Sequence, residues 1–267
     1  MNKIRNKIAK LFYKIFNMLE NNGVSDFKTN GEDIFLDFII KSYKGNDFIA
    51  FDVGANVGEY SKIILNMCVE NNVNGGVHIF EPTRKCFQKL EEIFSKNEQV
   101  FLNNFGLSSQ LKNSTIFYDK EKSGLASLYQ RDLVEYDIKL NKKENINLEK
   151  ASEYIKRSKI SHINLVKIDV EGHEMEVLRG FEDYLNPSFI DFIQFEYGGC
   201  NIDSKLFLRD LYRFFEEKGF SVAKIMSKNL EVRNYKAYME NFVYSNYVAF
   251  AKESKNFNTE KNDYILW

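Results

Sequence analysis

Acidic side chains and a histidine gather between Lys167 and His173. Asp169 directly follows an apolar run that we expect to be a buried strand. Gly172 permits a tight turn, which would bring Asp169, Glu171 and His173 together. Three ionisable groups so close to a strand end are poorly explained by packing. A histidine pKa of about 6.5 suits a general base at neutral pH, so we expect His173 to be the base, with Asp169 and Glu171 as alternatives.

Glu196 follows the next expected strand. Neighbouring parallel strands end at the same edge of a sheet, so we expect Glu196 to join this reaction centre. Asp169 and Glu196 could instead hold Mg²⁺ through their carboxylates. We prefer the version without a metal, and activity after chelation would separate the two.

A second informative segment follows the first expected strand and runs from Asp52 through Gly54 and Asn56 to Gly58. Its glycines allow a ligand close to the backbone, at the position where doubly wound sheets bind nucleosides. The middle glycine of the dinucleotide fingerprint is missing, and Asp52 favours a ligand that carries an amine. Glu81, followed by Pro82, ends the second expected strand, where a carboxylate can bind ribose hydroxyls.

The elements that must position these residues alternate between strands and helices. Apolar runs predict seven core strands at about 48–53, 77–80, 100–102, 163–168, 189–195, 220–226 and 247–251. Helical patterns lie between most of them, which indicates a mostly parallel α/β sheet with crossover helices. We expect the last two strands to form an antiparallel edge. Within an insertion at about 108–160, we predict a strand at 115–118 and a helix near 148–157.

The first twenty residues place apolar side chains at three- and four-residue spacing, with basic residues outside the stripe. This pattern predicts an amphipathic helix. The helix could pack on the domain, pair with a second subunit or lie on a membrane surface. We prefer packing or a homo-oligomer, and we expect weak binding to liposomes. The predicted organisation is a helical extension (1–30), an α/β domain (31–253) and a C-terminal tail (254–267).

Composition excludes several classes of protein. The 37 Lys and Arg residues balance 38 Asp and Glu residues, which argues against a nucleic-acid binder. The sequence has no apolar run of the roughly 20 residues that span a bilayer and no recognisable secretion signal. Cys68, Cys86 and Cys200 form no metal-binding or redox pattern. We therefore expect a cytoplasmic protein without an integral membrane segment.

These motifs together resemble the FkbM family of S-adenosylmethionine-dependent methyltransferases over about residues 48–196. The similar segments are 51–58, 80–82, 104–108, 124–128 and 167–180. The resemblance implies a Rossmann-like, seven-stranded class I methyltransferase fold, with S-adenosylmethionine as cofactor and S-adenosylhomocysteine as product. It also implies a set of cofactor-binding residues, namely Asp52, Gly54, Asn56 and Gly58 around the methionine portion, Glu81 and Pro82 at the ribose, Asn104 near adenine and Asp169 near the methyl group.

The resemblance further implies a small-molecule acceptor. We expect O-methylation of a carbohydrate hydroxyl on a nucleotide-linked sugar or a surface-glycan precursor, as in capsular polysaccharide biosynthesis. Another small-molecule or natural-product hydroxyl is the alternative. Two other classes stay open, an NAD-dependent oxidoreductase and a non-catalytic cofactor-binding module. Thermal shifts with S-adenosylhomocysteine against NAD would test the first, and turnover of an acceptor would test the second.

Overall fold

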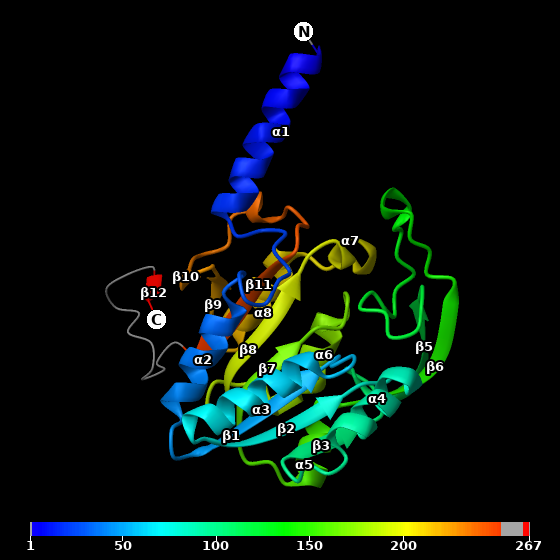
Figure 1. Cartoon of the computed structure of the whole chain (residues 1–267), viewed down its shortest axis with the longest axis vertical. Helices are drawn as coiled ribbons and strands as arrows, with labels where there is room; N and C mark the ends of the chain where they lie inside the picture. The colour runs from blue at the N-terminus through cyan, green and yellow to red at the C-terminus, as the bar shows by residue number, and fades with distance from the viewer. Residues whose placement is uncertain (1, 252–263, 267) are drawn as a thin grey trace.

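The computed structural model describes residues 2–251 and 264–266. Its main sheet contains these strands: β1 (Asp47–Val53), β2 (Asn74–Phe80), β3 (Val100–Asn103), β7 (Ile163–Ile168), β8 (Ile190–Tyr197), β9 (Phe220–Ile225), β10 (Asn229–Val232), β11 (Ser245–Ala251) and β12 (Tyr264–Leu266). Their order is β12-β10-β9-β11-β8-β7-β1-β2-β3 (Figure 1). All seven predicted core strands are confirmed.

The antiparallel part of the sheet differs from the expectation. β11 runs antiparallel to both β8 and β9 and lies between them, so it is an inner strand. The edge is built instead by β10, which is antiparallel to β9, and by β12, which is antiparallel to β10. β12 belongs to the segment that we predicted as a C-terminal tail. The other residues of that tail, 254–263 and 267, lie outside the described residues.

Helices cover both faces of the main sheet (Figure 1). Buried side chains of α2 (Glu32–Ser42), α3 (Glu59–Asn71) and α4 (Arg84–Phe94) form one hydrophobic core with the sheet. The opposite core contains α5 (Ala151–Ser158), α6 (Glu174–Gly180) and α8 (Leu208–Glu217). Successive residues of β1 serve different cores, since Ala50 belongs to the first and Phe51 to the second. The strands are therefore buried on both faces, as their apolar runs predicted.

The insertion contains a second, smaller sheet. Its strands are β4 (Gly106–Leu107), β5 (Lys112–Tyr118) and β6 (Lys142–Glu149), in the order β4-β6-β5. The predicted strand lies within β5, whereas sequence reasoning missed β6. Ile146 and Leu148 of β6 alternate with polar residues and are buried, as expected for a half-buried strand. The predicted helix is α5, which begins only after β6.

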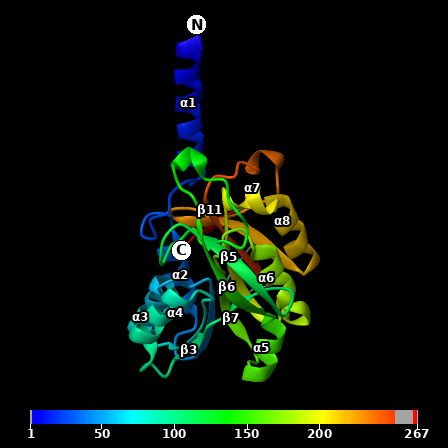
Figure 2. The ribbon, with the colours of Figure 1, turned by 90° about the vertical axis from the view of Figure 1, so that its right-hand side faces the viewer.

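α1 (Asn2–Leu19) projects away from the α/β domain (Figures 1 and 2). The expected packing of its apolar stripe on the domain is not observed, because Ile4, Phe12 and Met18 are 66–72% exposed. Its C-terminal end does contact the domain, where the ring of Phe16 packs edge-on against Tyr238. Among the residues that the structure describes, no helix has the length and apolar character needed to cross a membrane.

Short elements complete the described chain. They are α7 (Cys200–Ser204) and the 3₁₀ turns η1 (Val134–Tyr136), η2 (Glu182–Tyr184) and η3 (Ala237–Met239). α8 corresponds to the helical pattern between the fifth and sixth predicted core strands, and α7 precedes it as a separate turn of helix. α7 and η1 contribute to the rim of the site described next.

Candidate active site

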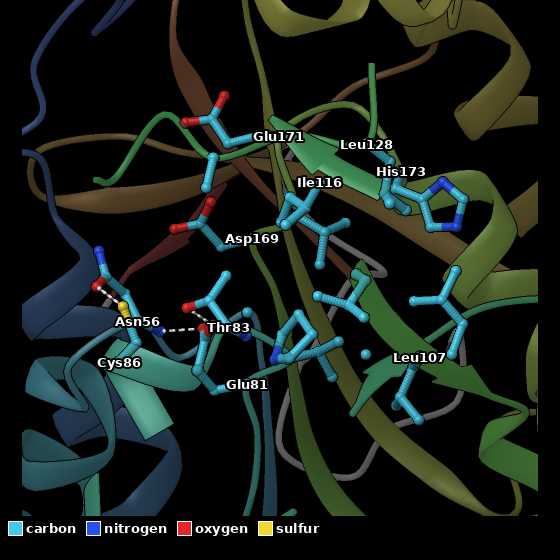
Figure 3. A pocket seen from close by; sticks show the side chains of 18 of the residues that line it. Asn56, Glu81, Thr83, Cys86, Leu107, Ile116, Leu128, Asp169, Glu171 and His173 are labelled. Carbon is cyan, nitrogen blue, oxygen red and sulfur yellow. Dashed lines mark hydrogen bonds between the residues drawn. The ribbon is translucent and has the colours of Figure 1, made fainter. Parts of the chain in front are cut away.

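A cavity with an empty volume of about 720 Å³ lies where β1, β2 and β7 end (Figure 3). Backbone hydrogen bonds hold the three strand ends together. The N–H of Gly54 donates to the carbonyl of Phe80, and the N–H of Asp169 donates to the carbonyl of Val53, both at 2.9 Å.

Gly54 makes this arrangement possible. Its φ is +86°, and a Cβ at this position would lie 1.9 Å from the carbonyl oxygen of Asp169. Any other residue would force the loops after β1 and β7 apart. The glycine therefore fixes the floor of the cavity and leaves the backbone open to a ligand.

Glu81 lies at the bottom of the cavity and is only 5% exposed. Its Oε1 accepts hydrogen bonds from the N–H and the hydroxyl of Thr83, and its Oε2 accepts one from the N–H of Asn56 at 2.9 Å. A carboxylate has about four acceptor positions, so Glu81 keeps one for a ligand hydroxyl. Burial raises the pKa of Glu81 to about 7, partly opposed by these hydrogen bonds.

The small sheet supplies an apolar wall opposite the strand ends. Leu107, Ile116, Ile146 and Leu148 line the cavity from β4, β5 and β6. The loop 123–128 closes it further, with Ala126 and Leu128 facing inward. A flat apolar group such as a purine base fits such a surface, whereas the polar groups at the strand ends suit a ribose and an amino acid.

The structure separates the predicted cofactor-binding residues into two groups. Gly54, Asn56, Glu81, Pro82 and Asp169 line the cavity. The other three, Asp52, Gly58 and Asn104, lie outside it.

Asp52 is turned away from the cavity. It is 2% exposed, and its carboxylate accepts a hydrogen bond from the hydroxyl of Ser61 on α3. Burial raises its pKa, opposed by Ser61 and by the charge of Lys167. This position is at odds with the expected contact to a ligand amino group and gives Asp52 a role in joining β1 to α3.

Gly58 and Asn104 also serve packing and loop geometry. A Cβ at Gly58 would meet the side chains of Leu90 and Phe94 at 2.6 and 2.7 Å, so this glycine allows α3 and α4 to approach each other. The Asn104 amide donates to the backbone carbonyls of Glu81 and Pro82. It holds the segment that carries Glu81, and it does so from outside the cavity.

Asp169 and Glu196 share a buried lysine. The Nζ of Lys167 lies 2.7 Å from Glu196 Oε1 and 3.8 Å from Asp169 Oδ2. The side chain of Lys167 is 4% exposed, whereas that of Asp169 is 39% exposed and faces the cavity. Enclosure by the protein and the charge of Glu196 raise the pKa of Asp169, although Lys167 opposes them.

This lysine bears on the Mg²⁺ alternative. The cation beside Asp169 and Glu196 is the ammonium of Lys167, whereas the sequence analysis placed Mg²⁺ between these two carboxylates. Within residues 2–251 and 264–266, no three His, Cys, Asp or Glu side chains form a group that could hold a metal ion. A site made of these two carboxylates and water would place Mg²⁺ beside the ammonium of Lys167, and it stays a prediction that chelation tests.

Glu171 occupies a strained turn at the mouth of the cavity. Its φ is +50°, in the left-handed region that non-glycine residues rarely adopt. The hydroxyl of Ser127 donates to its carbonyl at 2.6 Å, and Arg131 donates to its Oε2 at 2.6 Å. Burial raises the pKa of Glu171 to about 7, and Arg131 opposes this rise. Such strain is found preferentially at functional sites.

His173 lies farther from the strand ends. In Figure 3 its ring points away from Asp169 and Glu171, beyond Ile116 and Leu128. Its Nε2 is 3.0 Å from the hydroxyl of Ser108, and its Nδ1 is 3.3 Å from the hydroxyl of Tyr129. Burial lowers the pKa of His173 to about 4. The imidazole is thus neutral at pH 7, but both of its nitrogens already face protein hydroxyls.

A larger groove, with an empty volume of about 2050 Å³, adjoins the cavity. Glu196, Gly198 and Gly199 line it at the end of β8, and Tyr244 lines it beside them. Arg131 and the turn η1 form another part of its wall, and Tyr13 of α1 lies at its edge. Glu171 lines both the cavity and this groove. The two spaces therefore share Glu171 as a lining residue.

A model of the methyltransferase FkbM domain matches residues 52–222, more than half of the chain. The chain belongs to the FkbM methyltransferase family. S-adenosylmethionine, the methyl donor of such enzymes, is accordingly the expected cofactor, and the cavity at the strand ends is the candidate site for it. Its features fit that cofactor, because Glu81 keeps an acceptor position for a ribose hydroxyl and the small sheet offers an apolar surface for adenine.

Several proteins that are similar to this chain are named as methyltransferases. Methyltransferase 1 of Beauveria bassiana is 25% identical over 209 residues, which are 72% of this chain and 80% of that protein. Hexuronic acid methyltransferase AglP of Haloferax volcanii is 25% identical over 156 residues, 58% of each protein. A solved SAM-dependent methyltransferase from Agrobacterium tumefaciens aligns with 86% of this chain and 63% of its own, with 10% identity and a TM-score of 0.45.

Sequence reasoning missed several residues of the candidate site. Arg131 comes from a loop without any motif, and nothing in the sequence indicated its contact with Glu171. Ile146 and Leu148 did carry a signal, because their alternation with polar residues is typical of a strand. Lys167 was visible within the motif, but its charge was not assigned to Glu196.

Proposed function

We propose that this enzyme transfers a methyl group from S-adenosylmethionine to a hydroxyl of a carbohydrate, either a nucleotide-linked sugar or a surface-glycan precursor. The observation that carries the proposal is the position of Glu171, which lines both the cofactor cavity and the groove. A hydroxyl in the groove would meet a base at the place where the two spaces join. The similarity to a protein named hexuronic acid methyltransferase favours a sugar acceptor.

Glu171 suits the role of general base. A hydroxyl is a poor nucleophile at neutral pH, and a positioned base typically contributes about 10²–10⁴-fold to the rate. A base is most effective when its pKa is close to the working pH, and burial raises the pKa of Glu171 to about 7. As the acceptor oxygen bonds to the methyl carbon, the carbon–sulfur bond would break and release S-adenosylhomocysteine, and the hydroxyl proton would pass to the carboxylate of Glu171.

The other candidate bases are less well placed. His173 lines the cofactor cavity, but it is not among the residues that line the groove, and hydroxyl groups lie beside both of its ring nitrogens. Asp169 lies near the ammonium of Lys167. We therefore prefer Glu171 to His173, and we assign to Asp169 the electrostatic stabilisation of the reacting centre.

The bound cofactor supplies an electrophilic methyl group on a positively charged sulfur. Asp169 and Glu171 place negative charge close to that position, which favours a cationic ligand in a partly water-excluded site. Glu196, held by Lys167, lies on the groove side. Gly198 and Gly199 leave room for an acceptor beside the backbone at the end of β8.

An acceptor screen with methyl-labelled S-adenosylmethionine tests the proposal. The panel contains nucleotide sugars, including uronic acids, and non-carbohydrate alcohols and phenols. We expect label in an O-methyl group of a sugar, located by NMR. Transfer only to a non-carbohydrate hydroxyl would refute the carbohydrate assignment. Cofactor binding without transfer to any acceptor would favour a non-catalytic module.

A further inference from the structure

Most of the apolar stripe of α1 is exposed, although Phe16 at its C-terminal end packs against Tyr238 of the domain. Its most exposed members are Met18, Leu19, Ile4 and Phe12, which are 66–72% exposed, and Ile8 and Leu11 are at least half exposed. Figures 1 and 2 both show the helix projecting into solvent from the top of the domain. A contiguous apolar surface of this kind marks an interaction site.

The rest of α1 is strongly basic. Asn2–Leu19 contains Lys3, Arg5, Lys7, Lys10 and Lys14 and no acidic residue. The four lysines follow one another at spacings of four, three and four residues, so they share one flank of the helix. Among the described residues, none of these five side chains forms an ion pair.

The charge decides between two partners for this surface. A second copy of α1 would bring five more positive charges beside these five, and like charges at close range repel. Anionic lipid headgroups carry the opposite charge, and the acyl chains just below them can accommodate the apolar side chains of α1. A basic amphipathic helix with Leu and Phe on its apolar face is typical of peripheral membrane binding.

We propose that α1 docks on an anionic lipid surface, with its apolar stripe in the headgroup region and its lysines on the lipid phosphates. Tyr13, on the polar side of α1, lines the same groove as Glu171. Docking therefore holds one end of the acceptor groove at the bilayer. The inference replaces our preference from the sequence for packing or dimerisation, and it does not depend on the identity of the acceptor.

Co-sedimentation of the full chain with vesicles tests this docking. Vesicles of phosphatidylcholine with phosphatidylglycerol should bind the protein, vesicles of phosphatidylcholine alone should bind it weakly, and added salt should release it. A triple variant, Lys7→Gln with Lys10→Gln and Lys14→Gln, should lose about a hundredfold in affinity. A second variant, Leu11→Ser with Phe12→Ser, should also bind poorly, because it lacks part of the apolar stripe.

Matched controls separate docking from general charge and from catalysis. Lys44, Lys62 and Lys96 are exposed on the domain, so replacing these three with Gln should leave vesicle binding unchanged. All variants should keep methyl transfer to an acceptor in solution, which distinguishes failed docking from a failed functional assignment. Binding to neutral vesicles as strong as to anionic vesicles would overturn the proposal. So would a wild-type dimer that binds no vesicles and that dissociates in the Leu11→Ser, Phe12→Ser variant.

Discussion

A guanidinium N–H of Arg131 donates to Glu171 Oε2 at 2.6 Å, across 40 residues of sequence. The two side chains are 7% and 19% exposed, so water screens their interaction weakly. Burial raises the pKa of Glu171 to about 7, and Arg131 acts against that rise. The basicity of the carboxylate that joins the cofactor cavity to the groove is thus set by two opposing effects.

Removal of Arg131 should change the pH dependence of turnover. Arg131→Gln leaves burial in place without the opposing charge, so the pKa of Glu171 should rise above about 7. A general base must be deprotonated, and the acidic limb of the kcat profile should therefore move to higher pH. Arg157→Gln is the control, because Arg157 is exposed and pairs with Glu149. An unmoved limb would argue against Glu171 as base.

Direct replacement of the candidate bases should separate them. Glu171→Gln should lower turnover by about 10²–10⁴-fold at saturating cofactor, whereas His173→Gln should retain most of the activity. The wild-type profile adds a second criterion, since burial places the pKa of Glu171 at about 7 and that of His173 at about 4. A large loss of turnover in His173→Gln, together with an acidic limb near pH 4 in the wild-type profile, would identify His173 as the base.

The core strands of the sheet were predictable because they rest on local patterns. Apolar runs of the right length gave the seven core strands, and Gly54 and Glu81 were located by the strands that they follow. Asp52 shows the limit of such reasoning. It belongs to β1, where successive side chains point to opposite faces, and its carboxylate lies on the α3 side against Ser61. Sequence position gave the strand end but not the direction of the side chain.

Contacts between distant loops were beyond prediction from one sequence. Arg131 meets Glu171 only because the loop before η1 folds over the end of β7. The exposure of α1 is a similar case, since an amphipathic stripe predicts a helix but does not specify what covers its apolar face.

Variants of Glu81 and Asp52 should test whether Glu81 contacts the ligand and whether Asp52 instead stabilises the fold. Glu81→Ala removes a charge-assisted acceptor in the cavity, so the affinity for S-adenosylmethionine should fall by about ten- to a hundredfold, from roughly 1.5–3 kcal/mol. Asp52→Ala should instead lower the free energy of unfolding by about 1–3 kcal/mol, because it leaves the buried hydroxyl of Ser61 without its acceptor. Calorimetry and urea unfolding measure the two effects. If a folded Asp52→Ala protein lost more affinity for S-adenosylmethionine than Glu81→Ala does, Asp52 would have to contact the ligand.

The buried side chain of His78 should make the stability of the fold depend on pH. Its ring is stacked on Phe101 with centroids 4.4 Å apart, and its Nδ1 lies 2.7 Å from the hydroxyl of Tyr154. Burial lowers its pKa to about 4, whereas the unfolded value is about 6.5. Between these values the unfolded chain binds more protons, so the contribution of His78 to stability is lost as the pH falls from about 6.5 towards about 4.

The variant His78→Phe keeps an aromatic ring against Phe101 but cannot take up a proton. At about pH 8 it should be less stable than the wild type by about 1 kcal/mol, because the hydrogen bond to Tyr154 is lost. At about pH 5 the difference should shrink or reverse, since only the wild type carries the cost of a neutral His78. His173 is present in both proteins, so its similar titration cancels in the comparison. Urea unfolding at the two pH values measures the difference, and a constant gap would mean that His78 titrates normally in the folded protein.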